Sequence, residues 1–323
     1  AIVLPFVLLA LDVNKHLKMT LRNWIEKTPY FIGSVVVGVV SIYSREVVNG
    51  AGDFSSYFSF YEKISIFSNA LYLYIEKGFI ASNLIVFYGF PLKIHSSSIP
   101  IAFLLSPIWI VLGILVMIYF YKRLEKKYQG FFVFGLFFFI LNIFLVLNIT
   151  PFSETYFAER YAYLSLIGLF ISAAILINQL LDKTAVLINV AILFIGCYCL
   201  FMAYKANQRA HLWNSKQALW SHVVSSKVQH AYPYKMLGRY YADKRMHTNA
   251  IEIYNRGVKE NPYNVDLYFW RGKSIKENGD LDFAKKDFNR VIKTDSKLVG
   301  QAYYEGSLIY KQLQVSDTAR MYM

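Results

Sequence analysis

The sequence predicts an all-α protein in two parts, a polytopic transmembrane helix bundle followed by an α-solenoid of short helical repeats. Residues 1–204 consist of apolar stretches joined by short charged loops, and a pattern with a 34-residue period follows residue 230. Composition agrees, because 56% of the 323 residues are hydrophobic and only 17% are charged. We therefore expect a transmembrane domain at 1–204, a linker with a degenerate half repeat at 205–230, and repeats at 231–323.

Runs of about 20 apolar residues are long enough to cross a bilayer as helices. They predict a helix end at 1–11 and spans at 29–44, 100–121, 131–149, 161–178 and 185–204. Pro29 suits the first turn of its span, because the backbone N–H groups of a first turn have no acceptor within the helix, so proline loses no hydrogen bond there. The stretch 64–80 is apolar but contains Glu76 and Lys77, so it is either a weak span or a helix lying in the membrane interface.

Clusters of basic residues predict which side each loop faces. They occupy the first loop and the loop after residue 121, at Lys15, Lys18, Arg22, Lys27, Lys122, Arg123, Lys126 and Lys127. If both loops are cytoplasmic, 64–80 is an interfacial or re-entrant element, and the span 185–204 leads the repeats out of the cytoplasm. One additional span would place the repeats in the cytosol instead. We expect an integral protein of a bacterial inner membrane with periplasmic repeats.

The repeats rest on residues that recur at one spacing. Glycines and large aromatic residues each recur in steps of 34 residues, at Gly238, Gly272 and Gly306 and at Tyr254, Phe288 and Tyr322. Ala250 and Ala284 keep the same step, and Pro262 closes the first unit. A helix–turn–helix unit of this length and pattern is typical of the tetratricopeptide repeat. Repeats are expected to begin near Ala231, Val265 and Val299, after a capping half repeat at 213–226.

The first helices of the repeats predict a concave face that binds an extended polypeptide. Residues 205–323 carry 20 Lys/Arg and 11 Asp/Glu, which favours acidic partners, anionic headgroups or a peptide carboxylate. The residues expected on this face are Tyr232, Lys235, Arg239, Phe269, Lys273, Lys276, Tyr303 and Tyr310. Aromatic rings beside cations suit a peptide, and the alternative is a basic face that is only solvated. No recognition motif for nucleic acid supports that class of partner.

A short polar segment precedes the span at 161–178. Glu159 and Arg160 are adjacent where an outer loop enters the membrane, and Tyr161 follows them. Ionised groups at this depth are usually paired or functional. Arg160, Glu159 and Tyr161 are the residues expected to bind the phosphate of a lipid-linked donor. Arg160 could hold the phosphate, with Glu159 as its orienting group or as an acid/base. The alternative is an interfacial anchor, in which the arginine reaches the headgroups and Tyr161 joins the aromatic belt.

Four stretches in order give the chain a family resemblance. The segment AERYAYLSLIGL, at 158–169, resembles the AERYxYLPSIGL signature of membrane proteins with tetratricopeptide repeats after a type-C glycosyltransferase-like body. These are bacterial relatives of the transmembrane and tetratricopeptide-repeat-containing O-mannosyltransferases. The beginning AIVLPFVLLALD, the stretch from Ala70 to Pro91 and the Trp213–Trp220 bridge into the repeats also resemble that family. Ser165 stands where the family usually has proline, and Ala81 or Ser82 near another such proline.

The resemblance implies a sugar transferase with a polyprenyl-phosphate-linked donor and a Ser/Thr hydroxyl of a polypeptide as acceptor. The catalytic acids of that family lie in an early outer loop. Residues 1–204 of this chain contain no Asp-Asp or Asp-Glu pair, and the acids expected outside are separate from one another: Glu46, Asp53, Glu62, Glu154 and Glu159. The chain opens inside an apolar segment and stops within a repeat. We therefore expect the carboxy-terminal part of such an enzyme, without identifiable catalytic residues. The alternative is a membrane-anchored scaffold that binds partner proteins without catalysis.

Other chemistry has little support in the sequence. The six histidines are scattered and form no spaced ligand set. Cys197 and Cys199 lie two residues apart in an apolar run, which suits neither a disulfide nor half of a zinc site. A phosphate-binding glycine loop and a nucleophile elbow are both missing from the sequence. We expect no cofactor, although the resemblance leaves room for a divalent metal in the whole enzyme.

Overall fold

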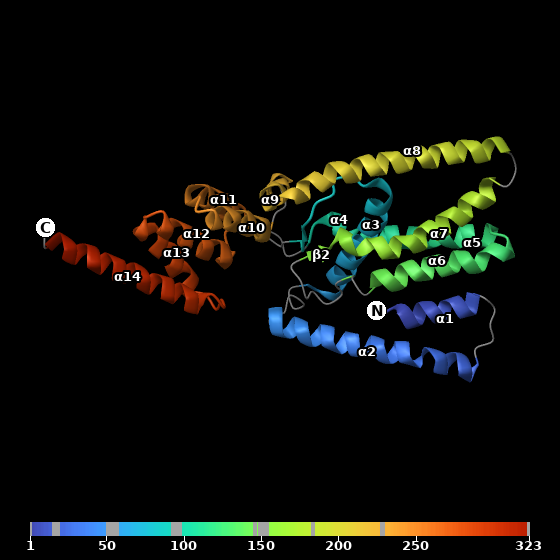
Figure 1. Ribbon diagram of the computed structural model, residues 1–323, viewed down its shortest axis with the longest axis horizontal. Coiled ribbons are helices and arrows are strands. Elements are labelled where there is room, and N and C mark those ends of the chain that lie inside the picture. Colours follow the sequence, from blue (N-terminus) through green and yellow to red (C-terminus); the bar gives the residue numbers. More distant parts are fainter. Residues whose placement is uncertain are drawn as a thin grey trace. The chain divides into compact units, whose positions relative to one another are not determined.

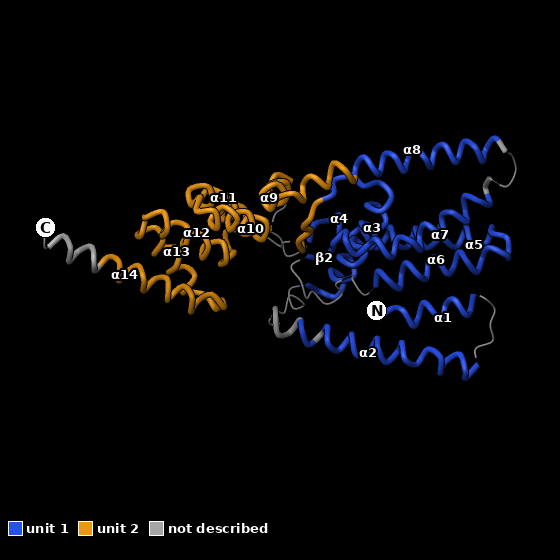
Figure 2. The backbone as a smooth tube through the Cα atoms, viewed as in Figure 1, with its two compact units in different colours: residues 1–84, 93–205 blue, residues 85–92, 206–323 orange. Residues whose placement is uncertain are grey.

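The computed structural model is mostly helical (Figure 1). It describes residues 2–14, 20–49, 58–91, 99–144, 147, 155–181, 185–226 and 230–321. The chain divides into two compact units (Figure 2): unit 1 is Ala1–Leu84 with Lys93–Lys205, and unit 2 is Ile85–Leu92 with Ala206–Met323. Unit 2 is thus discontinuous, because a short stretch from the first half of the chain belongs to it.

Among the residues that the structure describes, four helical segments are long and apolar enough to cross a membrane, which fits an integral membrane protein. They are Ile101–Arg123, Lys126–Phe144, Glu159–Gln179 and Val186–Asn214. The first comprises α4 (Ile101–Leu104) and α5 (Ser106–Arg123), and the second is α6 (Lys126–Phe144). The third joins the 3₁₀ turn η2 (Glu159–Tyr161) to α7 (Ala162–Leu181), and the fourth joins α8 (Ala185–Ala210) to η3 (His211–Asn214). Their apolar side chains are largely exposed, as a surrounding bilayer requires.

The N-terminal helices differ from the sequence expectation. Helix α1 covers Leu4–Asn14, and α2 covers Leu21–Asn49, so α2 begins well before residue 29. Pro29 therefore lies inside the helix and not in its first turn, which corrects the prediction. The hydroxyl of the preceding residue, Thr28, donates to the carbonyl of Trp24 at 3.0 Å. Pro29 removes one backbone donor, so the carbonyl of Ile25, four residues earlier, loses its helical partner, and membrane helices tolerate such a loss.

Helix α3 (Phe60–Ile80) begins before the expected residue 64 because a capping box starts it. The Ser59 N–H donates to Glu62 Oε2 at 2.8 Å, and the Glu62 N–H donates to Ser59 Oγ at 3.4 Å. Such a box satisfies two backbone donors at the start of a helix. One side of α3 is buried, and there Ser106 Oγ donates to the Ser65 carbonyl at 2.6 Å. The helix packs on α5 and α7 inside unit 1.

Helices α6 and α7 cross closely at small residues. A side-chain carbon at Gly135 would lie 2.6 Å from the Gly168 carbonyl oxygen, and one at Gly168 would lie 2.7 Å from the Phe139 nitrogen. Ser172 Oγ, on the next turn of α7, donates to the Phe132 carbonyl at 3.0 Å. Small residues and interhelical hydroxyl bonds are the usual means by which membrane helices associate.

Unit 2 consists of successive packed helices. They are α9 (Lys216–Ser225), α10 (Ala231–Asp243), α11 (His247–Glu260), α12 (Val265–Glu277), α13 (Leu281–Ile292) and α14 (Val299–Met321). Helices α10, α12 and α14 begin at the three residues from which the repeats were counted. Two apolar clusters form the core, one centred on Tyr254 and one on Phe288. These are the recurring aromatic positions of the first two repeats.

The expected helix–turn–helix of a third repeat does not occur among the described residues. Helix α14 continues from Val299 to Met321 without a turn. The turn after α12 uses Gly279 at φ +97°, and the turn after α10 uses Arg245 at φ +60°. Residues 309–321 contain no glycine or proline, so no comparable signal stops the helix there. The described residues also contain two short strands, β2 (Thr155–Phe157) in unit 1 and β1 (Tyr88–Gly89) in unit 2.

Candidate functional sites

The polar segment before α7 is fixed to α3 by a buried tyrosine. Tyr74 Oη donates to the Ala158 carbonyl at 3.3 Å and accepts from the Ala158 N–H at 3.4 Å. The rings of Tyr74 and Phe157 lie 4.4 Å apart, and both are almost fully buried. Tyr156 Oη also donates to Asn69 Oδ1 at 3.2 Å. The backbone that carries Glu159 and Arg160 is therefore held in one position.

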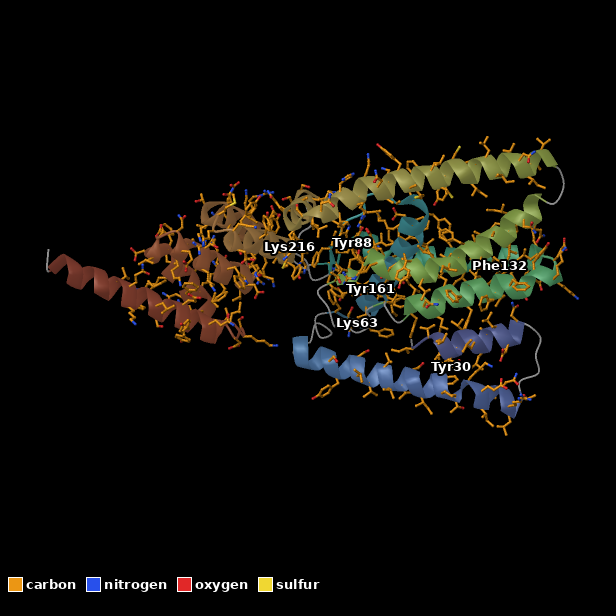
Figure 3. All side chains as sticks on the ribbon, in the orientation of Figure 1. Tyr30, Lys63, Tyr88, Phe132, Tyr161 and Lys216 are labelled. Atoms are coloured by element: carbon orange, nitrogen blue, oxygen red, sulfur yellow. The ribbon has the colours of Figure 1, made fainter. Side chains whose placement is uncertain are left out.

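Arg160 is exposed on this fixed segment, at the beginning of an apolar helix. Its Nη2 donates to Tyr161 Oη at 3.3 Å, and its guanidinium carbon lies 5.1 Å from the centre of the Tyr161 ring. Figure 3 shows Tyr161 where α7 begins. A guanidinium and the N-terminal end of a helix both attract anions, so the arrangement suits a phosphate group. Glu159 is partly buried, and the orienting contact shown for Arg160 comes from Tyr161, whereas the sequence analysis gave the orienting role to Glu159.

Two further ion pairs involve largely buried charges in unit 1. Lys27 Nζ pairs with Asp12 Oδ2, which connects α2 to α1. Lys77 Nζ donates to the Ser82 carbonyl at 2.7 Å and lies 3.5 Å from Glu76 Oε1. These charges stabilise helix contacts and a helix end. Within the described residues, no group of three potential metal ligands is close enough to hold an ion. The divalent metal that the family resemblance leaves room for stays a prediction.

The first helices of successive pairs in unit 2 are connected by ion pairs. Lys235 Nζ on α10 lies 2.8 Å from Asp266 Oδ2 on α12. Lys273 and Lys276 on α12 reach the two oxygens of Glu305 on α14, at 3.2 and 2.6 Å. Burial alone would raise the pKa of Glu305, but the hydrogen bond and charge of Lys276, helped by Lys273, hold that pKa below its usual value. All three of the predicted peptide-binding lysines thus have carboxylate partners on the next helix.

The aromatic residues of the predicted peptide-binding face divide into three groups. Phe269 is 1% exposed and packs in the core against Phe288, so its prediction as a peptide contact is wrong. Tyr232 stacks on Phe87 with ring centres 5.0 Å apart, inside unit 2. Tyr303 and Tyr310 are exposed, as a binding surface requires.

Trp270 is the residue on this face that the sequence analysis missed. The Arg239 guanidinium lies 4.5 Å from its ring centre, and Lys273 Nζ lies 5.4 Å from it. Because a helix turns about 100° per residue, a shift of one position moves the aromatic residue from the core to the partly exposed side. The signal was available: Arg239 and Lys273 occupy the same place in two consecutive repeats, and Trp270 lies between them in sequence.

Comparisons with models of known protein families, with curated proteins and with solved structures found no match. The functional interpretation therefore depends on the chemistry of two regions. One is the exposed guanidinium at the start of α7 in unit 1. The other is the surface of α10, α12 and α14 in unit 2.

Proposed function

We propose that this chain is the carboxy-terminal part of a membrane O-glycosyltransferase that uses a polyprenyl-phosphate-linked sugar and a polypeptide acceptor. The observation that carries this proposal is Arg160, an exposed guanidinium on a fixed backbone at the N-terminal end of a membrane-spanning helix. A lipid-linked sugar donor presents its phosphate at the surface of the bilayer. Arg160 is placed to bind that phosphate from the edge of the apolar helix.

The chemistry requires stabilisation of the departing lipid phosphate. Transfer of the sugar to a Ser/Thr hydroxyl leaves negative charge on the phosphate oxygens, and a preorganised cation lowers the energy of that state. The Tyr161 hydroxyl and ring hold the guanidinium, so its orientation requires little further ordering. A base must take the proton of the acceptor hydroxyl, and no residue of this chain is assigned to that role.

The helix pairs of unit 2 are proposed to be tetratricopeptide repeats that bind the acceptor polypeptide outside the cytoplasm. Support comes from the 34-residue register of α10, α12 and α14 and from the ion pairs that join these helices. The contact surface then consists of Trp270 with Arg239, together with the exposed Tyr303 and Tyr310. Rings and cations of this kind suit an extended polypeptide.

A membrane-anchored scaffold is the second candidate. The same surface of α10, α12 and α14 favours it, because binding of a polypeptide to exposed tyrosines and Trp270 needs no catalytic group. A whole protein that binds polypeptide but transfers no sugar from any polyprenyl-phosphate donor would support the scaffold.

Substitution of Arg160 in the intact protein tests the transferase. Arg160→Ala should lower sugar transfer from a polyprenyl-phosphate donor by about a hundredfold, the usual effect of removing one group that stabilises developing charge. Arg160→Lys should lose less, because it keeps the charge without the planar fork. Transfer is measured as labelled sugar recovered in polypeptide, and membrane insertion is verified separately.

Arg123 offers a matched control. Its guanidinium also lies over a tyrosine ring, 4.6 Å from the centre of Tyr119. Gln179, near the end of α7, donates to the Arg123 carbonyl at 2.9 Å, so Arg123 lies at the opposite end of the helices from Arg160. Arg123→Ala should retain transfer. Equal losses in the two alanine variants would reduce Arg160 to an interfacial anchor.

A further inference from the structure

A groove in unit 1 lies between α1, α6 and the end of α5. It has a volume of about 590 Å³ and is lined on α1 by Phe6, Leu9, Ala10, Val13 and Asn14. The α6 side provides Val133, Phe134 and Phe137 with Gln129 and Gly130, and α5 provides Tyr121. Ligand-binding cavities in proteins have similar volumes. Most of the lining is apolar, and only one end contains polar side chains.

The groove is open to the side and not enclosed. Phe6 is 43% exposed, Val13 59%, Val133 48% and Phe137 41%. In a membrane-spanning unit these side chains face lipid, so the groove is accessible to a hydrocarbon chain of the bilayer. An acyl chain that enters it would contact two helices at once, whereas one on a smooth helix face contacts only one.

Cations gather at the polar end of the groove. Lys126 lies four residues before Gly130 and seven before Val133, so it projects from the same side of α6 as the lining residues. The carboxylate of the neighbouring Glu125 pairs with Lys127 at 3.0 Å. Within the described part of the chain, Lys126 has no ion-pair partner. Lys122 and Arg123 end α5 at the same loop, next to Tyr121.

From this arrangement we infer that the groove binds an anionic phospholipid of the leaflet that faces the 122–127 loop. One acyl chain lies between α1 and α6, and the phosphate contacts Lys126 with the neighbouring Lys122. Basic pockets between membrane helices bind anionic headgroups in this way, because each cation near the surface adds attraction for the phosphate. This site is separate from Arg160, which lies at the other end of α7.

Native mass spectrometry of the intact protein in detergent tests this site. The probes are phosphatidylglycerol, phosphatidylcholine with identical acyl chains, and a polyprenyl phosphate. The unaltered protein should bind phosphatidylglycerol at least severalfold more tightly than phosphatidylcholine. Lys126→Gln should weaken the binding of phosphatidylglycerol about fivefold, as expected for the loss of one surface cation. Arg22→Gln, which removes an exposed cation of α2, should leave the preference unchanged.

A second pair of variants tests the apolar part of the site. Val133→Trp fills the groove and should reduce phosphatidylglycerol binding, whereas Val111→Trp, at a similarly exposed position of α5 outside the groove, should not. Equal binding of the two phospholipids would overturn the inference, as would equal effects within either variant pair. Tighter binding of polyprenyl phosphate than of phosphatidylglycerol would also overturn it, in favour of an isoprenoid site. None of these outcomes depends on sugar transfer, so the two proposals fail separately.

Discussion

Replacement of the three recurring glycines by alanine should have three different effects, although the sequence makes them equivalent. A side-chain carbon at Gly238 would collide with the ring of Tyr254, with Cδ1 only 2.8 Å away and two other ring atoms closer. At Gly272 the nearest atoms are Asp287 Cβ and Phe288 Cε1, both at 3.1 Å. At Gly306, no atom of the described residues lies within 4 Å.

The sizes of the effects follow from these contacts. Tyr254 is fully buried, so its ring has no space to retreat the roughly 1 Å needed for normal carbon contact near 3.5 Å. Overpacking of this kind costs about 1–3 kcal/mol, while alanine gains about 1 kcal/mol of helix propensity over glycine. Gly238→Ala should thus destabilise its helix by about 1 kcal/mol net, and Gly272→Ala should be close to neutral. Gly306→Ala should stabilise α14 by about 1 kcal/mol.

Hydrogen exchange of the intact protein measures each effect locally. Peptides from α10, α12 and α14 report the opening free energy of each helix, because amides exchange when the helix opens. The difference of about 2 kcal/mol between the extremes corresponds to a factor of about thirty in protection. A destabilising effect of Gly306→Ala as large as that of Gly238→Ala would refute the reasoning. It would show that another helix covers Gly306, as a complete third repeat requires.

Three other predictions concern His230, Tyr254 and the crossing of α6 and α7. Burial, and then the charge of Lys235, lower the pKa of His230 from 6.5 to about 4. The contribution of neutral His230 to the free energy of unfolding is therefore complete above pH 6.5 and is lost as the pH falls towards 4, by at most about 3 kcal/mol. Thermal unfolding at pH 7 and at pH 4.5 should show this loss of stability. In His230→Asn, which keeps a capping acceptor but does not titrate, the loss should disappear. An unchanged pH dependence in that variant would contradict the assignment of the loss to His230. The buried Tyr254 hydroxyl has no hydrogen-bond partner among the described residues, and Phe288 fills the same repeat position. Tyr254→Phe should therefore raise the free energy of unfolding by about 1 kcal/mol, which is seen as a higher unfolding temperature. A lower unfolding temperature would reveal a partner of the hydroxyl. Gly168→Ile should separate α6 from α7 and reduce the yield of folded protein in detergent, measured by size-exclusion chromatography. Gly113→Ile, at a position with no neighbour within 4 Å among the described residues, should not reduce this yield. Equal yields of the two variants would contradict the close crossing of α6 and α7.

The sequence was most informative where a spacing or a run of one residue type determines structure directly. Apolar length predicted the membrane-spanning helices around 100–121, 131–149, 161–178 and 185–204, and four candidate spans lie there. Helix ends were less predictable, because they depend on local hydrogen bonds. The capping box of Ser59 and Glu62 moved the start of α3.

The candidate sites were predictable by segment and less so by residue. The sequence identified the Glu159–Arg160 segment, but the contact between Arg160 and Tyr161 depends on side-chain geometry. Phe269 was placed on the surface because the position of a helix face was estimated one residue out of phase. The groove beside α6 could not be predicted at all, since α1 and α6 are far apart in sequence and single-helix patterns do not show which helices become neighbours.

The short stretch 85–91 has a practical consequence for anyone who wishes to study unit 2 by itself. The Phe87 ring lies 4.9 Å from that of His230 and stacks on Tyr232, the His230 ring occupies the space beside Gly89, and Arg209 Nη2 donates to the Ile85 carbonyl at 3.4 Å. A fragment that starts at residue 206 would lack residues 85–91 and would leave His230 and Tyr232, at the start of α10, without these contacts. Joining residues 85–91 to the N-terminus of such a fragment through a flexible linker should restore the packing of Phe87 on His230 and Tyr232.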